Sequence, residues 1–340
     1  MEFTDLRNKI AGAIYGVALG DAMGMPAYFS PDETKEKLGW IDDFLDAPFD
    51  HPVHKGFLAG QVTDDTEQTL SLANAIIKEG KVSIEGVAKA LLSWYEEVGG
   101  DDSSYVGPST KAAMMRMKKG EDLYITGIGG TTNGAVMRIS PVGIIHPGDF
   151  DSALKDAELS CIPTHNTNVA ISGASAWAVG IALAIGGKSW DEILSGMEVA
   201  SEKGAKKGAK FILPSIKERF NFVYAIIDSQ RNIEDVLENI YNIIGTGLPV
   251  YEIVPAALGI VLLSEGDPLK AAIYSANCSG DADTLGAISC SLAGAVSGVS
   301  SIPVRYIKKL QMVNEKYDFE RIIDKLTEIA FKNMKKNKEV

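Results

Sequence analysis

Residues 279–284 read Ser279-Gly280-Asp281-Ala282-Asp283-Thr284, and an apolar stretch with helical spacing follows directly. The two carboxylates are two residues apart, which is the wrong spacing for one face of a helix, where neighbours are three or four residues apart. This spacing suits an extended turn, in which alternate side chains point the same way. We therefore expect Asp281 and Asp283 to converge on one point just ahead of a helix.

A second acidic cluster, Thr63-Asp64-Asp65-Thr66, lies more than two hundred residues upstream and also precedes an apolar helical pattern. Both clusters offer oxygen ligands and no nitrogen or sulfur. Hard divalent cations such as Mg²⁺ or Mn²⁺ take carboxylate, hydroxyl and water oxygens, whereas zinc sites usually contain His or Cys. If the two clusters meet in the fold, they predict a site for such a cation.

Each cluster also has a structural alternative. Asp and Thr are common at helix N-caps, and Asp64 with Glu67 three residues later fits a capping box, so the upstream cluster taken alone is better explained as a cap. One cap needs only one aspartate, so the downstream pair requires a further explanation. The presence of two such clusters in one chain favours the metal site.

Composition bounds the class of protein. The chain has 340 residues, of which 46% are hydrophobic, so it can bury a large core. Its formal net charge of -12 disfavours nucleic acid or an anionic membrane as a partner, because both would be repelled by an acidic surface. The N-terminus shows no secretory signal pattern, and the three cysteines include no CxxC pair. We therefore expect a reducing, cytoplasmic location.

Helical periodicity dominates the chain. The longest apolar stretch, residues 169–185, is interrupted by serines and glycines, so it predicts a buried helix and not a membrane span. Residues 124–126 and 136–139 have β-like composition but lie in glycine-rich sequence, so we expect loops there. No linker divides the chain, and we expect one all-α domain over residues 1–340. Helices are predicted at 6–22, 64–79, 83–97, 108–118, 150–160, 167–186, 190–203, 215–228, 233–243, 251–264, 268–276, 284–297, 303–314 and 319–335.

Four glycines recur at intervals of four residues near the N-terminus: Gly12, Gly16, Gly20 and Gly24. Each glycine costs roughly 1 kcal/mol in a helix interior relative to alanine, so such a series indicates that another element must approach closely. For Gly12 and Gly16 we expect tight helix packing. Gly20 and Gly24 are expected to mark the end of the helix and a turn that leads to Pro26.

Six ordered motifs give the chain a more specific resemblance, and they span about residues 8 to 305. In this order they resemble the motifs of the ADP-ribosylglycohydrolase family. Each motif alone is weak, but chance is an implausible source of all six in the family's order. The motifs are Gly20-Asp21-Ala22-Met23-Gly24-Met25-Pro26, Thr63-Asp64-Asp65-Thr66, Asn133-Gly134-Ala135-Val136-Met137-Arg138-Ile139-Ser140-Pro141, Thr164-His165, Gly245-Thr246-Gly247 and Gly280-Asp281-Ala282-Asp283-Thr284.

The resemblance implies a compact, all-α orthogonal helical bundle with a metal-lined cleft that holds two Mg²⁺ or Mn²⁺ ions. It also implies hydrolysis of an N- or O-glycosidic bond at the distal ribose of ADP-ribose. Carried over position by position, it assigns six residues to the metal pair, in agreement with the oxygen-only ligands noted above, and it assigns catalysis to Asp65 and Asp283. The implied metal ligands are Thr63, Asp64, Asp65, Asp281, Asp283 and Thr284.

On the substrate side, the resemblance implies that backbone amides of a glycine loop contact a diphosphate, although spacing alone fits an ordinary turn. It implies that His165 contacts the ligand or supports the cleft, and that Arg138 holds an acidic residue in place. The polar loop from Asp101 to Tyr105 is better explained as a solvated loop. The implied substrate-binding residues are Gly129, Gly130, Thr131, Asn133, His165, Gly245 and Gly247.

One position departs from the family. Two residues after the proline of the first motif the family usually has a glutamate, and this chain has Tyr28. A phenol with an ordinary pKa near 10 is a poor base at neutral pH. Asp32 or Glu33 could take the role, Asp65 or Asp283 could act on a metal-bound water, or the activity could be altered or lost.

The function expected from the sequence is metal-dependent hydrolysis of ADP-ribose attached to a protein side chain or a small molecule. One alternative is a metal-dependent ADP-ribose-binding protein without turnover, which the presence of Tyr28 permits. Another is a hydrolase of other small ribosides. The expected partner is an ADP-ribosylated protein or a small-molecule riboside, with no nucleic acid and no membrane.

Overall fold

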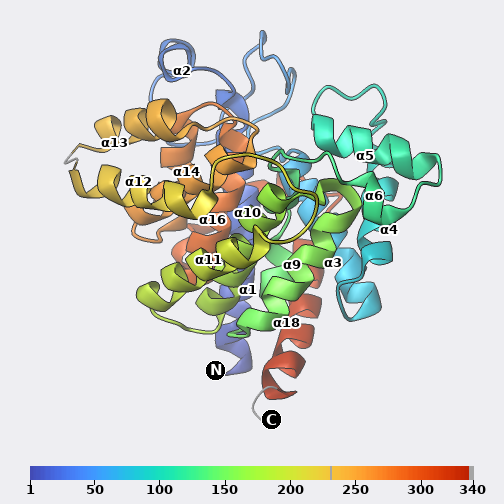
Figure 1. The fold of residues 1–340 in the computed structure, drawn as a ribbon. Coiled ribbons are helices and arrows are strands. Elements are labelled where there is room, and N and C mark those ends of the chain that lie inside the picture. The colour runs from blue at the N-terminus through green and yellow to red at the C-terminus, as the bar shows by residue number, and fades with distance from the viewer. Residues whose placement is uncertain (230–231, 337–340) are drawn as a thin grey trace.

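The computed structural model describes residues 1–229 and 232–336, and helices make up its whole framework (Figure 1). Within these residues there is no β-strand, and β-pairing is limited to two isolated bridges. The all-α prediction is confirmed. The α-helices are α1 Phe3–Gly24, α2 Pro31–Leu38, α3 Asp64–Glu79, α4 Ile84–Glu97, α5 Pro108–Lys118, α6 Leu123–Thr126, α7 Gly134–Met137, α8 Ser140–Ile144, α9 Phe150–His165, α10 Asn168–Ile185, α11 Trp190–Gly204, α12 Ile216–Ser229, α13 Ile233–Asn239, α14 Val250–Leu263, α15 Pro268–Cys278, α16 Ala282–Ser297, α17 Val304–Val313 and α18 Phe319–Lys336.

Every helix that periodicity predicts is present, and the differences concern short elements. Residues 240–244, predicted as the end of one helix, form a π-helical turn after α13. The expectation of loops was wrong for 124–126, which lie in the single-turn helix α6, and for 136–137, which end the single-turn helix α7, whereas 138–139 lie outside any helix, as expected. Such turns are too short for a periodic signal, and tertiary contacts support them: the Thr126 hydroxyl donates to the Pro163 carbonyl, 2.7 Å away.

The glycine series lies along the contact between α1 and α16. A Cβ added at Gly12, Gly16, Gly20 or Gly24 would overlap a backbone carbonyl of α16. The backbones therefore touch directly. The expectation that Gly20 marks the helix end was wrong, because α1 continues to Gly24, whereas Gly24 is the last residue of the helix and precedes the turn at Met25–Ala27, as expected. Both glycines are needed for the close approach. This contact joins the segments that carry the first and last motifs of the chain.

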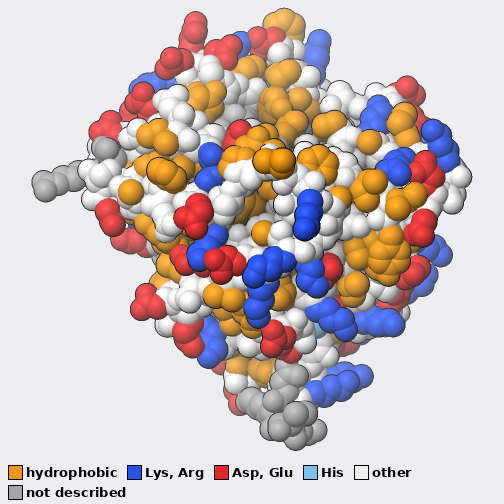
Figure 2. All heavy atoms as spheres, viewed as in Figure 1, with side chains coloured by type: hydrophobic (Ala, Val, Ile, Leu, Met, Phe, Trp, Pro, Cys, Tyr) orange, Lys and Arg blue, Asp and Glu red, His pale blue; other side chains and the backbone are white. Residues whose placement is uncertain are grey.

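Two helices, the Phe3–Ala27 segment and α10, are long and apolar enough to cross a membrane by length and composition alone. Both are almost entirely buried inside the fold, as the core helices of a globular protein are. The three cysteines are also buried, and each is a free thiol. On the face shown in Figure 2, acidic and basic side chains are interspersed among apolar ones.

Candidate active site

The loop ahead of α16 is held in an unusual backbone conformation. Ser279 and Gly280 both have positive φ, 68° and 79°, and a side chain at Gly280 would collide with Thr246. The backbone N–H of Asp281 then donates to the Thr246 carbonyl at 2.8 Å. The helix begins at Ala282, so Asp283 lies in its first turn and not in the extended turn that we expected. Both aspartates nevertheless line the same pocket.

The upstream cluster forms the start of α3. Thr63 is the N-cap, and its hydroxyl accepts a hydrogen bond from the backbone N–H of Asp65 at 3.4 Å. Asp64 is therefore the first helical residue and not the cap, so the predicted capping box of Asp64 with Glu67 was wrong. Glu67 is buried and instead accepts hydrogen bonds from side chains around it, including the Trp94 indole at 2.9 Å.

A residue of α1 fixes this first turn of α3. The fully buried carboxylate of Asp21 accepts the backbone N–H of Thr63 with both oxygens, at 3.1 and 3.0 Å. It also accepts the backbone N–H of Thr66 at 3.1 Å and the Thr66 hydroxyl. The sequence analysis gave Asp21 no role, although it belongs to the first motif. Its bonds tie the helix that packs on α16 to the helix that carries Asp64 and Asp65.

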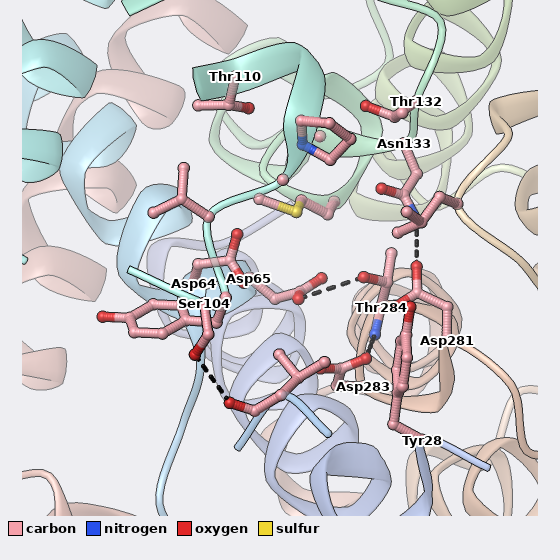
Figure 3. A pocket seen from close by; sticks show the side chains of 18 of the residues that line it. Tyr28, Asp64, Asp65, Ser104, Thr110, Thr132, Asn133, Asp281, Asp283 and Thr284 are labelled. Atoms are coloured by element: carbon pink, nitrogen blue, oxygen red, sulfur yellow. Dashed lines mark hydrogen bonds between the residues drawn. The ribbon is translucent and has the colours of Figure 1, made fainter. Parts of the chain in front are cut away.

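The two acidic clusters meet in one pocket (Figure 3). The Thr284 hydroxyl donates to Oδ2 of Asp65 at 3.2 Å, across 219 positions of sequence. The Thr63 hydroxyl lies 3.3 Å from the same oxygen. The cavity has a volume of about 120 Å³. The predicted metal ligands that line it are Asp64, Asp65, Asp281, Asp283 and Thr284, while Thr63 is buried beneath it.

Burial dominates the electrostatics of the pocket. Loss of solvent and the charge of Asp283 raise the pKa of Asp64, Asp65 and Asp281 well above the ordinary value. Burial acts on Asp283 in the same sense, but the hydrogen bond and charge of His54 outweigh it and lower the pKa of Asp283. Burial and mutual repulsion thus oppose the simultaneous ionisation of these aspartates unless a cation lies among them.

These residues fit a divalent cation. In the described residues no Lys or Arg forms an ion pair with the four pocket aspartates, and Oδ1 of Asp65 is buried without a hydrogen-bond partner. Buried carboxylates ordinarily have cationic or metal partners. Among the described residues, no three His, Cys, Asp or Glu side chains already lie in an arrangement that could hold a metal ion. An ion would therefore have to draw these carboxylates together.

Tyr28 lines the pocket beside Asp281 and Asp283 (Figure 3). Burial and the charges of these two aspartates raise the pKa of Tyr28 to about 12, so the phenol keeps its proton at neutral pH. The structure places the suggested substitutes elsewhere. Glu33 forms a capping box with Ser30 at the start of α2, and Asp32 lines a separate cavity between α2 and α13.

His54 is a pocket residue that the sequence analysis missed. It lies in the irregular segment between α2 and α3, and its Nε2 is 2.8 Å from Oδ2 of Asp283. No periodic pattern marks that segment, and 229 positions of sequence separate the two residues. Only the His-x-x-His spacing of His51 and His54 could have drawn attention to it.

The pocket rim next to His54 also includes residues that were expected to lie in a solvated loop. Ser104 and Tyr105, from the loop expected to be solvated, line the pocket. The Tyr105 hydroxyl lies 3.4 Å from Glu67, which also accepts from Lys316 at 3.0 Å. Asp101 is exposed, as expected, and pairs with Lys118 at 2.8 Å.

Asn133 is the one predicted substrate-side residue that lines this pocket, and its side chain donates to Oδ2 of Asp281. Thr131 and Gly130 lie next to it in sequence, where the Thr131 carbonyl accepts from the Val250 N–H at 3.2 Å. Gly129 is exposed. None of these three residues lines the cavity.

Gly245 and Gly247 lie beside the loop that positions Asp281. Gly245 has φ of 88°, and a side chain there would collide with Glu252. The Gly247 N–H donates to Glu252 at 3.3 Å. Since Thr246 between them accepts the N–H of Asp281, this glycine turn supports the acidic cluster.

His165 supports the cleft through its contact with a residue of the pocket rim. It is fully buried, and its Nε2 lies 3.1 Å from the hydroxyl of Thr132, a rim residue. Burial and the charge of Arg138 hold the pKa of His165 well below its ordinary value, so the ring is neutral. Arg138 itself reaches the cluster indirectly: it donates to Gln68 at 2.9 Å, and Gln68 donates to Asp64 at 3.0 Å.

A comparison with known protein families gives a match along nearly the whole chain. The sequence profile described as ADP-ribosylglycohydrolase matches residues 3–336. This chain belongs to the ADP-ribosylglycohydrolase family. At a coarse level it is therefore a hydrolase, of a family that acts on ADP-ribosylated proteins or small molecules.

Individual members of the ADP-ribosylglycohydrolase family resemble the chain over nearly its full length. The uncharacterised protein YegU of Escherichia coli is 34% identical over 92% of this chain and 94% of its own length. The ADP-ribosyl-[dinitrogen reductase] glycohydrolase of Rhodospirillum rubrum is 26% identical over 96% and 97%. A solved structure named ADP-ribosylglycohydrolase-related protein complex shares the fold, with a TM-score of 0.70 and 23% identity over 96% of this chain and 99% of that one.

Proposed function

We propose that this protein is a divalent-metal-dependent hydrolase of the glycosidic bond between ADP-ribose and a protein side chain or small molecule. The observation that carries the proposal is the meeting of two acidic clusters from opposite halves of the chain, joined by Thr284 and Asp65 at 3.2 Å. Four buried aspartates without a Lys or Arg partner in the described residues require a cation to be ionised together.

The residues that would hold two Mg²⁺ or Mn²⁺ ions are those that the sequence assigned. When bound, such ions lower the pKa of coordinated water and help to orient ribose hydroxyls. All six side chains offer the hard oxygen donors that these cations prefer. They are Thr63, Asp64, Asp65, Asp281, Asp283 and Thr284.

The chain's own groups can perform the remaining chemistry. Cleavage breaks the bond from the anomeric carbon to the leaving nitrogen or oxygen, water supplies the new C–O bond, and the proton that the water loses balances the proton that the leaving group gains. The carboxylate of Asp283 can stabilise the positive charge that develops on the sugar. Oδ1 of Asp65, which has no partner among the described residues, can accept a proton from the attacking water. Thr284 holds the other oxygen of Asp65, which fixes the orientation of this carboxylate.

In the absence of a bound cation, the pKa of Asp65 is shifted in the direction that suits a general base. An effective general base has a pKa near the working pH, and an ordinary aspartate lies well below it. Burial and neighbouring carboxylates raise the pKa of Asp65. Tyr28 keeps its proton near neutral pH, so its hydroxyl can donate a hydrogen bond but cannot readily serve as the base.

Tyr28 also favours a second candidate function, metal-dependent binding of ADP-ribose without turnover. Measurements of turnover and of binding separate the two. ADP-ribosyl-arginine, ADP-ribosyl-serine and simple nucleosides should be assayed with Mg²⁺, with Mn²⁺ and with EDTA, and ADP-ribose should be titrated calorimetrically under the same conditions.

We expect cleavage of one ADP-ribosyl substrate with metal and loss of that cleavage in EDTA. Tight, metal-dependent binding of ADP-ribose with no turnover would establish the binding protein instead. Cleavage of nucleosides alone would establish a hydrolase of other ribosides. Equal turnover with metal and in EDTA would remove the metal-dependent mechanism.

A further inference from the structure

The segment between α11 and α12, drawn in yellow in Figure 1, carries apolar side chains on the outside of the molecule. Phe211, Ile212 and Leu213 are consecutive and exposed, and Ile212 is fully exposed. Runs of three or more exposed apolar residues are uncommon in globular proteins and ordinarily mark an interaction surface. Ile212 contributes no buried area to the core, so folding does not account for this run.

The backbone of this segment is nevertheless held in one position. The Ala209 N–H donates to the Asn166 carbonyl, and the Ala209 carbonyl accepts from the Asn168 N–H, each at 2.9 Å. The Asn168 side chain binds both backbone groups of Phe211, the N–H at 2.9 Å and the carbonyl at 3.2 Å. These polar bonds fix the main chain, so a partner that binds the apolar side chains does not have to order a flexible loop.

A second exposed apolar segment lies on the other side of Asn166. The Asn166 side chain donates to the Tyr124 carbonyl at 2.8 Å, and its backbone N–H donates to the Gly127 carbonyl at 2.8 Å. Asn166 therefore bonds to both segments, which lie side by side. We call their exposed side chains the apolar face; they are Tyr124, Ile125, Ile128, Phe211, Ile212 and Leu213.

The apolar face lies close to the rim of the candidate active site. Ile128 is four residues from Thr132, and both Thr132 and Asn133 line the pocket. Four residues of extended chain span at most about 14 Å. The glycine loop between them is tied to the start of α10, because the Thr167 hydroxyl donates to the Gly130 carbonyl at 2.6 Å. A protein whose ADP-ribosyl group occupies the pocket can therefore contact the apolar face as well.

The charge beside the apolar face indicates which kind of protein fits. Residues 203–219 contain five lysines and one arginine against one glutamate, in a chain with a net charge of -12. Three of these lysines pair with acidic residues of α9 and α11. Lys206 and Lys210 are exposed and form no ion pair within the described part of the chain. Their charge is free to attract an acidic partner.

We propose that the apolar face, with Lys206 and Lys210, docks an acidic protein that carries the ADP-ribosyl group bound in the pocket. This inference rests on the function proposed above, and it identifies the substrate as a modified protein and not a small riboside. An anionic membrane fits less well, because the carboxylates of Asp151 and Glu202 lie among the lysines. A protein can place its acidic groups between these carboxylates, whereas a uniformly anionic surface cannot.

The test presents one ADP-ribosyl linkage on three carriers: serum albumin, which is acidic, histone, which is basic, and the free amino acid. We expect kcat/KM for modified albumin to exceed that for the modified amino acid at least about 10-fold, and modified histone to show no such gain. Ile212→Asp should remove most of the albumin advantage while turnover of the modified amino acid is unchanged, because Ile212 is exposed and outside the pocket. Lys210→Glu should act in the same direction.

Val304→Asp is the matched control, because Val304 is also an exposed aliphatic residue but lies on α17. It should leave kcat/KM unchanged for all three carriers. Binding of fluorescently labelled, modified albumin is measured in parallel by anisotropy, so that docking is tested even without turnover. We expect Ile212→Asp to weaken this binding at least about 10-fold and Val304→Asp to leave it unchanged.

The possible outcomes separate docking from catalysis. Cleavage of the modified amino acid with no advantage for albumin, or an advantage that Ile212→Asp retains, would overturn docking and leave the proposed function standing. No cleavage of any carrier, with albumin binding still weakened by Ile212→Asp, would overturn the hydrolysis and retain docking. A dimer in analytical ultracentrifugation that Ile212→Asp dissociates would assign the face to a second copy of this chain and overturn the proposal. Cosedimentation with phosphatidylserine vesicles that Ile212→Asp abolishes would assign it to a membrane, with the same consequence.

Discussion

Replacing Asp21 with alanine tests how α1 holds the acidic turn at the start of α3. The substitution removes the acceptor of two buried backbone N–H groups, those of Thr63 and Thr66, and leaves a small void in their place. The Thr66 hydroxyl can rotate toward another acceptor, but a backbone N–H cannot. The two amides thus determine the energetic cost.

An unpaired buried donor costs about 1–3 kcal/mol, so the two amides together should lower the free energy of unfolding by about 2–6 kcal/mol. This is a large fraction of a typical stability of about 5–15 kcal/mol. The first turn of α3 should also lose its fixed position. We therefore expect weaker Mn²⁺ binding in the same variant, because Thr63 and Asp65 lie in that turn.

Urea unfolding in EDTA, followed by circular dichroism, measures the change without any contribution from bound metal. Asp267→Ala is the matched control. Asp267 also accepts two backbone N–H groups, at 2.8 and 3.1 Å, but at a partly exposed helix start, where loss of a cap costs about 1 kcal/mol. If Asp21→Ala costs no more than Asp267→Ala, then Asp21 does not hold the turn at the start of α3.

Three further predictions concern the pocket. Asp283→Asn keeps the shape of the side chain but removes a charge, so Mn²⁺ affinity measured by calorimetry should fall at least about 10-fold while circular dichroism is unchanged; unaltered affinity would contradict a ligand role. Tyr28→Glu should raise glycohydrolase turnover, because a carboxylate can accept a proton that the phenol cannot, and a well-placed base contributes about 10²–10⁴-fold; a neutral or harmful effect would indicate that another carboxylate, such as Asp65, already serves. The rise in melting temperature on adding Mn²⁺ should be larger at pH 8 than at pH 5, because the raised pKa of Asp65 means that metal must displace its proton at low pH; an equal rise at both values would show that no buried carboxyl titrates on binding.

The sequence predicted the helices well, because their signal is local. Apolar spacing and capping residues identified α3, α4 and α10 to within one or two residues. The prediction from sequence failed for α6 and α7, which are single turns held by distant contacts. Gly20 was misjudged for a related reason: a glycine that ends a helix and one that admits a neighbouring backbone look alike until the neighbour is known.

The acidic half of the site was predictable for chemical reasons. Two oxygen-only clusters in one chain have few explanations other than a shared cation, and the structure brings them together. His54 was not predictable in this way, because its partner Asp283 is 229 positions away and only the spacing to His51 marks it in the sequence. Tyr105 was similarly hidden, since only the fold shows that its loop covers the pocket.

The glycine contact between α1 and α16 has a consequence for synthesis of the protein. About 260 residues separate Gly20 from Gly286, the two glycines whose backbones meet at its centre. At roughly 5–20 residues per second, α1 emerges from the ribosome roughly 15 to 50 s before α16 is complete. During that time an apolar helix that ends up buried lacks its partner α16, and chaperones are suited to protect it. A chain that stops before Asp281 lacks two of the four pocket aspartates, Asp281 and Asp283, so every molecule that assembles this pocket has been translated through its final motif.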